Sequence, residues 1–388
     1  MSILAAYSPA AQQASNILAA RARWSPLEIA FWLAACASIF LLPSKHLILT
    51  EIAILGLFAL SLDLILGYAG IVSLGHAAFF GFGAYVAGIL AKHGIVKEPL
   101  LALLVSGLAA TVVGFITSFL VLRGSDLTRL MVTLGVALVL REIANRLDIT
   151  GGADGLQGIV MEPLLGHFAF DIFGKTAYIY SLAVLFVLFL IARRIVNSPF
   201  GLSLRSVKGN PLRAAAVGIN VNRRLVAVYT VAAGYAGIAG ALLTQSTQFA
   251  SLSVLDFDRS ADVLMILIIG GTGYLYGGLI GAVLFKLVQD YLANVTPQYW
   301  QFWLGLVLVM MIMFGRVYGA VIAALIFAFC TVTKLPFMHS IIFTVVLVLV
   351  LGVVRPRILK VTSAITERAV ALQQSLRTRF TRSGQGSA

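Results

Sequence analysis

The chain has 388 residues, of which 60% are apolar and only 11% are Asp, Glu, Lys or Arg, whereas a soluble domain carries about 25% charged residues. This composition excludes a secreted enzyme, a cytosolic enzyme and an ordinary nucleic-acid binder, because so much apolar surface needs lipid as its solvent. The net charge of +13 therefore indicates Lys and Arg held on the cytoplasmic side of a membrane. Cys36 and Cys330 each lie in an apolar run, so neither a disulfide framework nor a metal site is predicted.

Apolar runs long enough to cross a membrane as helices follow one another along the chain, and they lack the period-two alternation of barrel strands. The sequence predicts an all-α fold, a polytopic membrane helical bundle with about 10–12 membrane segments that include broken or re-entrant helices. Residues 260–292 are ambiguous because glycines interrupt them. The other candidate spans are 26–43, 47–67, 73–91, 99–122, 127–147, 173–192, 225–248, 300–315, 317–334 and 338–354.

The charges of the connecting segments predict the orientation. Seven basic residues and no acidic one lie in 193–224, and the tail 355–388 is also basic, whereas 147–171 holds four acidic residues and no Lys or Arg. We therefore expect 193–224 and the tail to be cytoplasmic and 148–171 to be external. The parity of the crossings then requires 260–292 to cross zero or two times, which a helix pair broken at its glycines satisfies. Arg141 and Arg146 fit this orientation poorly, although Glu142 can pair with Arg146.

The expected domain organisation follows from these segments. Residues 1–25 form a cytoplasmic N-terminal segment without an evident cleavable signal peptide. Residues 26–354 form the transmembrane domain, and 355–388 form a basic cytoplasmic tail whose apolar stripe favours an amphipathic helix on the inner leaflet.

Two glycine-rich segments are candidates for function. The first runs from Gly67 to Ala78, and it is open to two interpretations, close helix packing or unwound backbone beside a transport path. The second has six glycines within 270–281. It favours a broken helix, because irregular backbone at membrane depth is tolerated only where protein or a water-filled cavity covers it.

The basic segment 197–220 is a candidate docking element. Asn210 or Pro211 can start a short helix and Gly218 can end it. Small residues between basic flanks suit a cytosolic partner, and a lipid anchor is the alternative. Residues 169–176 match only a relaxed phosphate-loop pattern with bulky side chains and no preceding strand, so no nucleotide site is predicted. No recognisable catalytic or metal-binding motif stands in the sequence either.

These motifs, taken together, resemble a known family. The chain is similar to the M-type permease subunit of the branched-chain amino acid ABC importers, whose relatives include urea and amide importers. The resemblance covers about residues 47–314, whereas 315–388 fall outside it and Gly278 stands where a proline is common. The matching pieces are 67–76, 150–156, 198–201, 215–220, 236–241 and 270–282.

The resemblance implies site residues in three groups. The first group borders the translocation path, the second couples the chain to an ATPase subunit, and the third lies in an external loop. In that order they are Ser73, Gly75, His76, Gly270, Gly271 and Gly273; Asn210, Arg213, Ala215, Ala216 and Gly218; and Gly151, Gly152, Asp154 and Gly155.

The resemblance also implies the function. The chain would be the transmembrane permease subunit of an ATP-binding-cassette importer for branched-chain or related amino acids in a bacterial cytoplasmic (inner) membrane. It would bind no cofactor, and ATP would be hydrolysed by two separate cytosolic ATPase subunits. A second permease subunit in a heterodimer, a periplasmic or extracellular substrate-binding protein and membrane lipid would be its partners, without nucleic acid.

Three alternatives remain open at this point. The chain could be a urea or amide ABC permease. A proton-coupled secondary transporter could use Asp63 or Glu142, since acidic residues inside a membrane are costly and often functional. A membrane-embedded enzyme could use Ser73 and His76, but no partner base of recognisable spacing stands in the sequence.

Overall fold

The computed structural model describes residues 24–124, 126–171 and 173–332, and every regular element in this part of the chain is a helix. The all-α membrane bundle predicted from the sequence is confirmed. The predicted span 338–354, the tail 355–388 and nearly all of 1–25 lie outside the described residues. The α-helices are α2 (Pro26–Leu41), α3 (His46–Ala69), α4 (Ala77–Lys92), α5 (Pro99–Val121), α6 (Asp126–Arg146), α7 (Lys175–Val196), α8 (Pro199–Gly209), α9 (Pro211–Ala216), α10 (Val221–Thr247), α11 (Phe257–Gly270), α12 (Leu275–Val295), α13 (Trp300–Phe314) and α14 (Arg316–Val332).

Helices of membrane-spanning length and apolarity recur along the described chain. Within the described residues, five helical segments meet both criteria, namely 43–69, 99–121, 175–196, 221–247 and 275–295. Shorter apolar helices, including α2 and α4, accompany them. The chain folds into two compact units, of which the first ends at Tyr291 and the second begins at Leu292.

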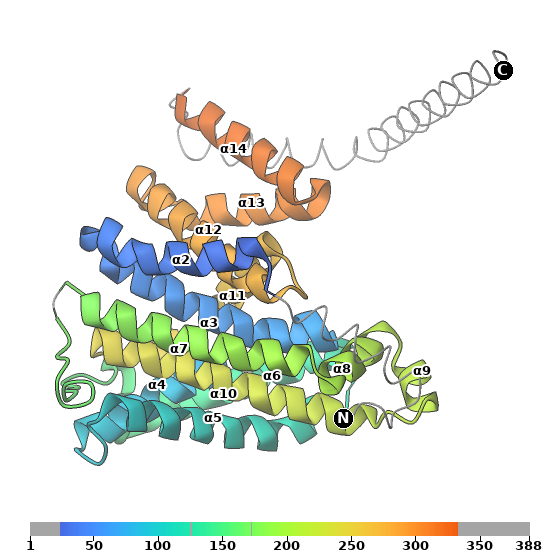
Figure 1. The fold of residues 1–388 in the computed structure, drawn as a ribbon, viewed down its shortest axis with the longest axis horizontal. Helices are drawn as coiled ribbons and strands as arrows, with labels where there is room; N and C mark the ends of the chain where they lie inside the picture. The colour runs from blue at the N-terminus through green and yellow to red at the C-terminus, as the bar shows by residue number, and fades with distance from the viewer. Residues whose placement is uncertain (1–23, 125, 172, 333–388) are drawn as a thin grey trace, which may run out of the picture. The chain divides into compact units, whose positions relative to one another are not determined.

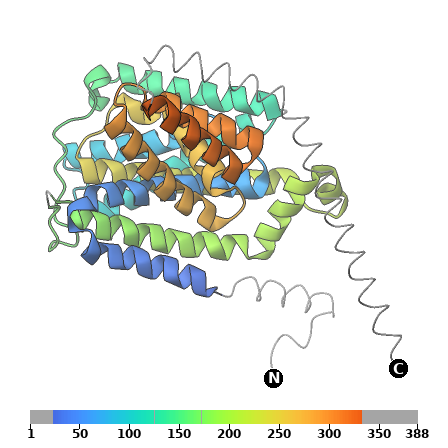
Figure 2. The same ribbon diagram turned by 90° about the horizontal axis from the view of Figure 1, so that it is seen from above.

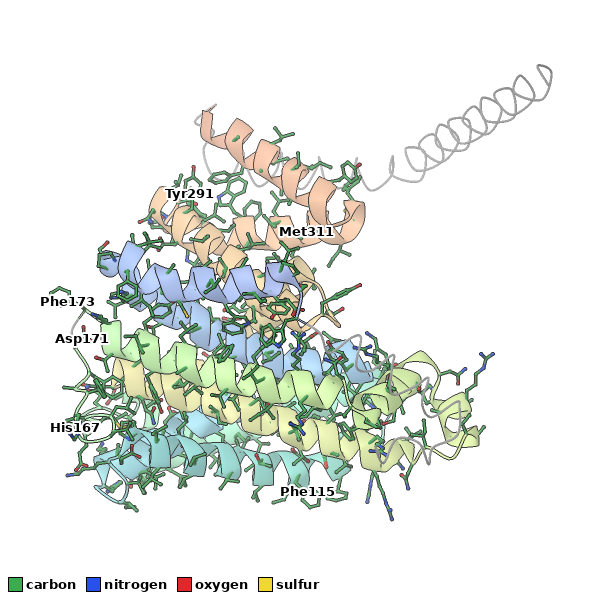
Figure 3. All side chains as sticks on the ribbon, in the orientation of Figure 1. Phe115, His167, Asp171, Phe173, Tyr291 and Met311 are labelled. Carbon is green, nitrogen blue, oxygen red and sulfur yellow. The ribbon has the colours of Figure 1, made fainter. Side chains whose placement is uncertain are left out.

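In the first unit the axes of the long helices are nearly aligned, as Figure 1 shows for α2, α3, α7, α10 and α5. α3 and α10 form its centre and are buried along most of their length. α10 packs on α3, α4 and α5, while α2 lies beside α7 at one margin and α6 lies at the opposite margin (Figure 2). α5 faces outward, and its Phe115 projects away from the bundle (Figure 3).

Glycines bring the backbones of α4 and α10 into direct contact. A Cβ atom added at Gly240 would lie 1.7 Å from the Phe80 carbonyl oxygen, and one added at Gly83 would lie 2.1 Å from the Gly237 carbonyl oxygen. Since helices in lipid associate through close packing of small residues, these glycines fix the centre of the bundle.

The two ends of the first unit differ in charge. We call the end that carries α8, α9 and Arg193 the basic end (Figure 1), and the end that carries 147–174 and 249–258 the acidic end. His167, Asp171 and Phe173 lie at the acidic end (Figure 3). There, partial burial tends to raise the pKa of Asp171, but hydrogen bonds from the backbone N–H groups of Thr176 and Lys175 outweigh it, and the pKa is lowered overall.

Ion pairs at the acidic end account for the two arginines that fit the predicted orientation poorly. Arg141 Nε lies 2.5 Å from the Asp256 carboxylate, and Arg146 Nε lies 2.6 Å from the Glu142 carboxylate. Each positive charge is therefore neutralised locally, and only the second of these pairs was evident from the sequence.

The ambiguous stretch 260–292 is a helix pair, as predicted. α11 ends at Gly270 and α12 begins at Leu275. Residues 70–76 depart from the prediction, because the expected span at 73 begins as a helix only at Ala77. Gly70, with a φ of +76°, ends α3, and the chain then continues without regular structure through buried residues such as Ser73 and Gly75.

The described part of the second unit is a pair of helices. α13 and α14 pack on each other, with Gly315 between them at a φ of +86°. The ring centroids of Trp303 and Phe327 lie 5.0 Å apart in an edge-on contact. The predicted span 300–315 corresponds to α13, and 317–334 corresponds to α14 as far as it is described.

Candidate translocation and coupling sites

The break between α11 and α12 is anchored on α3 by a buried carboxylate. Asp63 is fully buried, and its Oδ1 accepts a hydrogen bond of 2.7 Å from the backbone N–H of Gly273. Gly271 and Gly273 have φ angles of +99° and +82°, which L side chains rarely adopt. A Cβ atom at Gly67 would lie 2.5 Å from the Gly273 nitrogen, so α3 and the break touch through their backbones.

A lysine of α8 reaches the same place. The Lys208 ammonium donates a hydrogen bond of 2.7 Å to the Gly67 carbonyl oxygen, and the Arg205 guanidinium lies 5.2 Å from the centre of the Tyr68 ring. A cavity of about 580 Å³ opens beside them, and Tyr274 also lines it. The segment predicted to couple to an ATPase is thus bonded to the end of α3 that holds the helix break.

The segment 70–76 contacts α3 and α6. His76 Nε2 lies 2.8 Å from the Ser61 hydroxyl. A Cβ atom at Gly75 would lie 1.8 Å from the Thr133 carbonyl oxygen, and the N–H of Leu74 donates to the Thr133 hydroxyl at 3.2 Å. The Ser73 hydroxyl is buried, and no partner for it occurs among the residues the structure describes.

The six residues predicted to border the path belong to two segments, and each segment is bonded to a different residue of α3. Gly273 is bonded to Asp63, whereas His76 is bonded to Ser61, and a separation of two residues turns these side chains to different sides of the helix. Each segment is therefore bonded to α3 at its own position.

The glycines of the second segment have different physical roles. A Cβ atom at Gly270 would lie 1.8 Å from the Gly277 carbonyl oxygen, and one at Gly281 would lie 2.1 Å from that of Ile266, so these glycines let α11 and α12 pack closely. Gly271 and Gly273 instead supply the backbone angles of the break. The helix break that the sequence favoured is therefore present, together with close packing of the two helices.

The predicted coupling residues form an exposed helical turn. Asn210 accepts a hydrogen bond of 3.0 Å from the N–H of Arg213 and so caps α9. Ala215, Ala216 and Gly218 are exposed, while Ala214 is buried.

Two apolar side chains beside these residues were missed from the sequence. Leu212 is 83% exposed and Val217 is 82% exposed. They stand next to Arg213 and Gly218 and are the large apolar side chains beside three alanines on this turn, and that is the signal that could have found them. Large apolar side chains that project into water at the tip of a loop indicate a protein contact or a membrane contact.

The predicted external loop is folded against the next connection. The N–H of Leu156 donates to the Ala250 carbonyl at 2.7 Å, and the N–H of Ala250 donates back at 3.2 Å. Asp154 is exposed. Gly151, Gly152 and Gly155 all have positive φ angles, so the loop has a defined shape.

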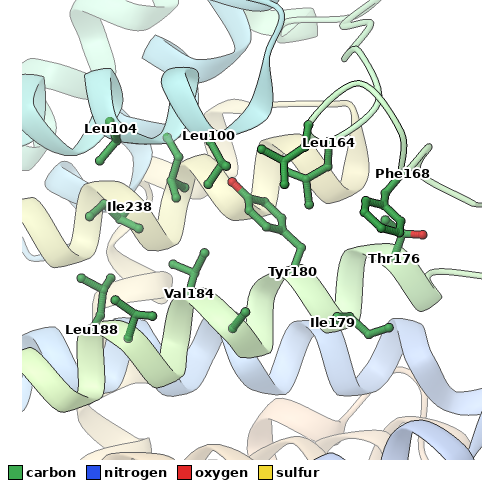
Figure 4. A pocket seen from close by; sticks show the side chains of 14 residues that line it. Leu100, Leu104, Leu164, Phe168, Thr176, Ile179, Tyr180, Val184, Leu188 and Ile238 are labelled. Carbon is green, nitrogen blue, oxygen red and sulfur yellow. The ribbon is translucent and has the colours of Figure 1, made fainter.

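An apolar groove on the described bundle does not resemble a polar path. It has a volume of about 510 Å³ and lies between α5, α7 and α10, with Leu164 and Phe168 at one edge (Figure 4). The Tyr180 hydroxyl, which belongs to its lining, donates to the Pro99 carbonyl at 3.4 Å. Such a surface suits a lipid acyl chain.

A bundle of apolar helices with charged ends, unwound backbone inside it and a helical hairpin at its basic end defines a multi-pass helical membrane protein. Residues 46–314 match the family model described as the branched-chain amino acid transport system permease component, and the chain belongs to this family. No solved structure matches the chain.

Two relatives are each about one quarter identical to the chain over the aligned residues. The high-affinity branched-chain amino acid transport system permease protein LivM of Escherichia coli K12 is 26% identical over 278 residues, which are 66% of this chain and 65% of LivM. The probable branched-chain amino acid transport permease protein LivH of Methanocaldococcus jannaschii is 26% identical over 263 residues, which are 62% of this chain and 79% of LivH. The match to LivM thus spans just under two thirds of that relative.

Proposed function

We propose that the chain is a permease subunit of an ATP-binding-cassette importer for branched-chain or related amino acids. The observation that carries this proposal is the hydrogen bond from Lys208 of α8 to Gly67 at the end of α3, beside the break that Asp63 holds. It joins the exposed hairpin of α8 and α9 to the end of α3, beside the unwound backbone of the helix break. The names of the relatives supply the substrate class.

The partners follow from the same proposal. Two cytosolic ATPase subunits hydrolyse ATP, and one of them binds α8 and α9 of this chain. A second permease subunit completes the path, and a substrate-binding protein delivers the amino acid at the acidic end. The basic end then faces the cytoplasm of a bacterial inner membrane, in agreement with the positive-inside rule.

Reconstitution tests the function. The full chain is co-expressed with candidate permease, ATPase and binding-protein subunits, and uptake of radiolabelled leucine into proteoliposomes is measured. We expect uptake that requires both ATP and the binding protein. Uptake driven by a proton gradient without ATPase subunits would contradict the proposal, and uptake of urea or amides alone would contradict the substrate class.

The orientation is tested by cysteine labelling. Ser206 and Gln157 are exposed at the basic and acidic ends. In a background without Cys36 and Cys330, we expect an impermeant maleimide to label Gln157→Cys in intact cells and Ser206→Cys only after the cells are opened. If Ser206→Cys alone were labelled in intact cells, the orientation would be the reverse of the proposed one.

The docking surface is tested by a charge placed in it. Replacing Ala216 with Asp should abolish co-purification of the ATPase subunits while membrane insertion persists, because an unpaired charge in a packed contact costs about 3–5 kcal/mol. Ala153→Asp, at an exposed alanine of the acidic end, is the matched control and should bind normally. Normal association of the Ala216→Asp variant with the ATPase subunits would contradict docking at α9 and favour the alternative, in which this loop anchors the chain on lipid.

A further inference from the structure

A small charged cavity lies at the opposite end of the bundle from the hairpin. Its volume is about 160 Å³, and it lies among α3, α4, α10, α11 and α12. Glu51, Arg259, Asp262 and Lys286 bring two negative and two positive charges to its lining. Glu51 precedes Asp63 by twelve residues on α3, which places the cavity about 18 Å along the helix from the break.

The inner wall of this cavity is apolar. Ile54, Phe80 and Phe285 line it, and all three are almost fully buried. Helical spacing explains how the wall and the charges come together, because Glu51 and Ile54, like Arg259 and Asp262, are three residues apart and share a helix face.

The charges in the cavity are only partly matched. Lys286 and Glu51 form an ion pair across it, and Glu51 is the more exposed of the two, so it marks the mouth. Within the part of the chain that the structure describes, the side chains of Arg259 and Asp262 form neither an ion pair nor a hydrogen bond. A half-buried guanidinium and carboxylate beside an apolar wall are costly unless charged groups meet them.

We propose that this cavity binds a small zwitterion with an aliphatic side chain. The Arg259 guanidinium receives the α-carboxylate in the bidentate geometry that it favours. The Asp262 carboxylate receives the α-ammonium group, and the aliphatic side chain lies against Ile54, Phe80 and Phe285. The cavity volume of about 160 Å³ is several times the roughly 10–15 Å³ of such volume that one water molecule needs, so a small aliphatic amino acid fits with part of it in the mouth.

This inference rests on the proposed function for its substrate class, but it adds a substrate site inside this single chain. The site lies at the acidic end, where the proposed binding protein would release its amino acid. The substrate therefore binds first at a site that is separate from the helix break.

Direct binding to the full chain in lipid nanodiscs, without any binding protein, tests the site. The probe is radiolabelled L-leucine, and the competitors are 3-methylbutylamine, which lacks the carboxylate, and 4-methylpentanoate, which lacks the ammonium group. We expect leucine to bind and each competitor to bind at least about tenfold more weakly, since each loses one charge-assisted contact.

Variants assign the two charges. Arg259→Gln should weaken leucine binding at least about tenfold and leave the weak binding of the amine unchanged, while Asp262→Asn should weaken leucine binding and leave that of the carboxylate unchanged. Arg146→Gln, at an exposed arginine of the same end, is the control and should bind leucine normally.

Three results would overturn the inference. They are no leucine binding to the wild-type chain at millimolar concentration, competitors that bind as tightly as leucine, and leucine binding that neither variant changes. The competitor series needs no variant, so it decides the question even where a substitution prevents folding. Leucine import by the complete reconstituted complex, measured separately, would then show that the proposed function stands while the site fails.

Discussion

Replacing Gly240 with alanine should destroy the packing of the first unit. The added Cβ atom would lie 1.7 Å from the Phe80 carbonyl oxygen, which is backbone and cannot swing aside as a side chain can. α4 and α10 would have to separate along their whole contact. Overpacking of a core costs about 1–3 kcal/mol and occasionally more. We expect purified protein in detergent to melt at least about 5 °C lower, or to aggregate during extraction.

Gly135 provides the matched control. It lies within α6, and nothing stands within 4 Å of a Cβ atom added there. Gly135→Ala should be neutral or raise stability by about 0.4–1 kcal/mol, because alanine has less conformational freedom to lose on folding. Equal melting temperatures for the Gly240 and Gly135 variants would mean that the close contact of α4 and α10 does not hold in the membrane.

Asp63 should tolerate asparagine but not alanine. Its role in the structure is to accept the N–H of Gly273 at 2.7 Å, and an asparagine side chain keeps an acceptor oxygen there. Alanine would leave that N–H without its partner, which costs about 1–3 kcal/mol. We expect leucine uptake by the reconstituted complex to stay near the wild-type rate in Asp63→Asn and to fall at least about tenfold in Asp63→Ala.

The same pair of variants separates this role from proton coupling. A carboxylate that carries protons through a transport cycle is inactivated by asparagine as well as by alanine, because neither amide nor methyl can titrate. Loss of uptake in both variants, with normal levels of protein in the membrane, would therefore favour a proton-coupled mechanism over the role of a hydrogen-bond acceptor.

The helices were largely predictable from the sequence, and the reason is local. The length of a membrane helix follows from the length of its own apolar run. For this reason α3, α5, α7 and α10 begin and end within a few residues of the predicted spans. The unwound backbone of 70–76 was one of two interpretations of its glycines, and the sequence alone could not decide between them. The segment looks as apolar as a helix, but its backbone is bonded instead to Thr133 of α6, and the next helix starts on a hydrogen bond from Ala77 to Ser260.

The candidate sites were predictable as segments but not as contacts. Glycine clusters and a basic loop can be read locally, whereas Asp63 and Gly273 are 210 residues apart and Gly67 and Lys208 are 141 apart. Nothing in the spacing of the sequence pairs them. The cavity at the acidic end escaped for the same reason, since its charges come from three helices that only the fold brings together. The predicted roles of the site residues, and the division at residues 25 and 354, stay predictions.

The Lys208 contact has a consequence for α3 itself. The last four carbonyl groups of a helix have no partner within it, and together they carry about half a negative charge. Lys208 meets one of them, at Gly67, with a full positive charge from another part of the chain. If α8 withdrew, the final turn of α3 would lose this neutralising ammonium, and the backbone contact of Gly67 with Gly273 would loosen. The stability of the last turn of a central helix thus depends on an element outside it, so that order at the core of the bundle is adjustable from its surface.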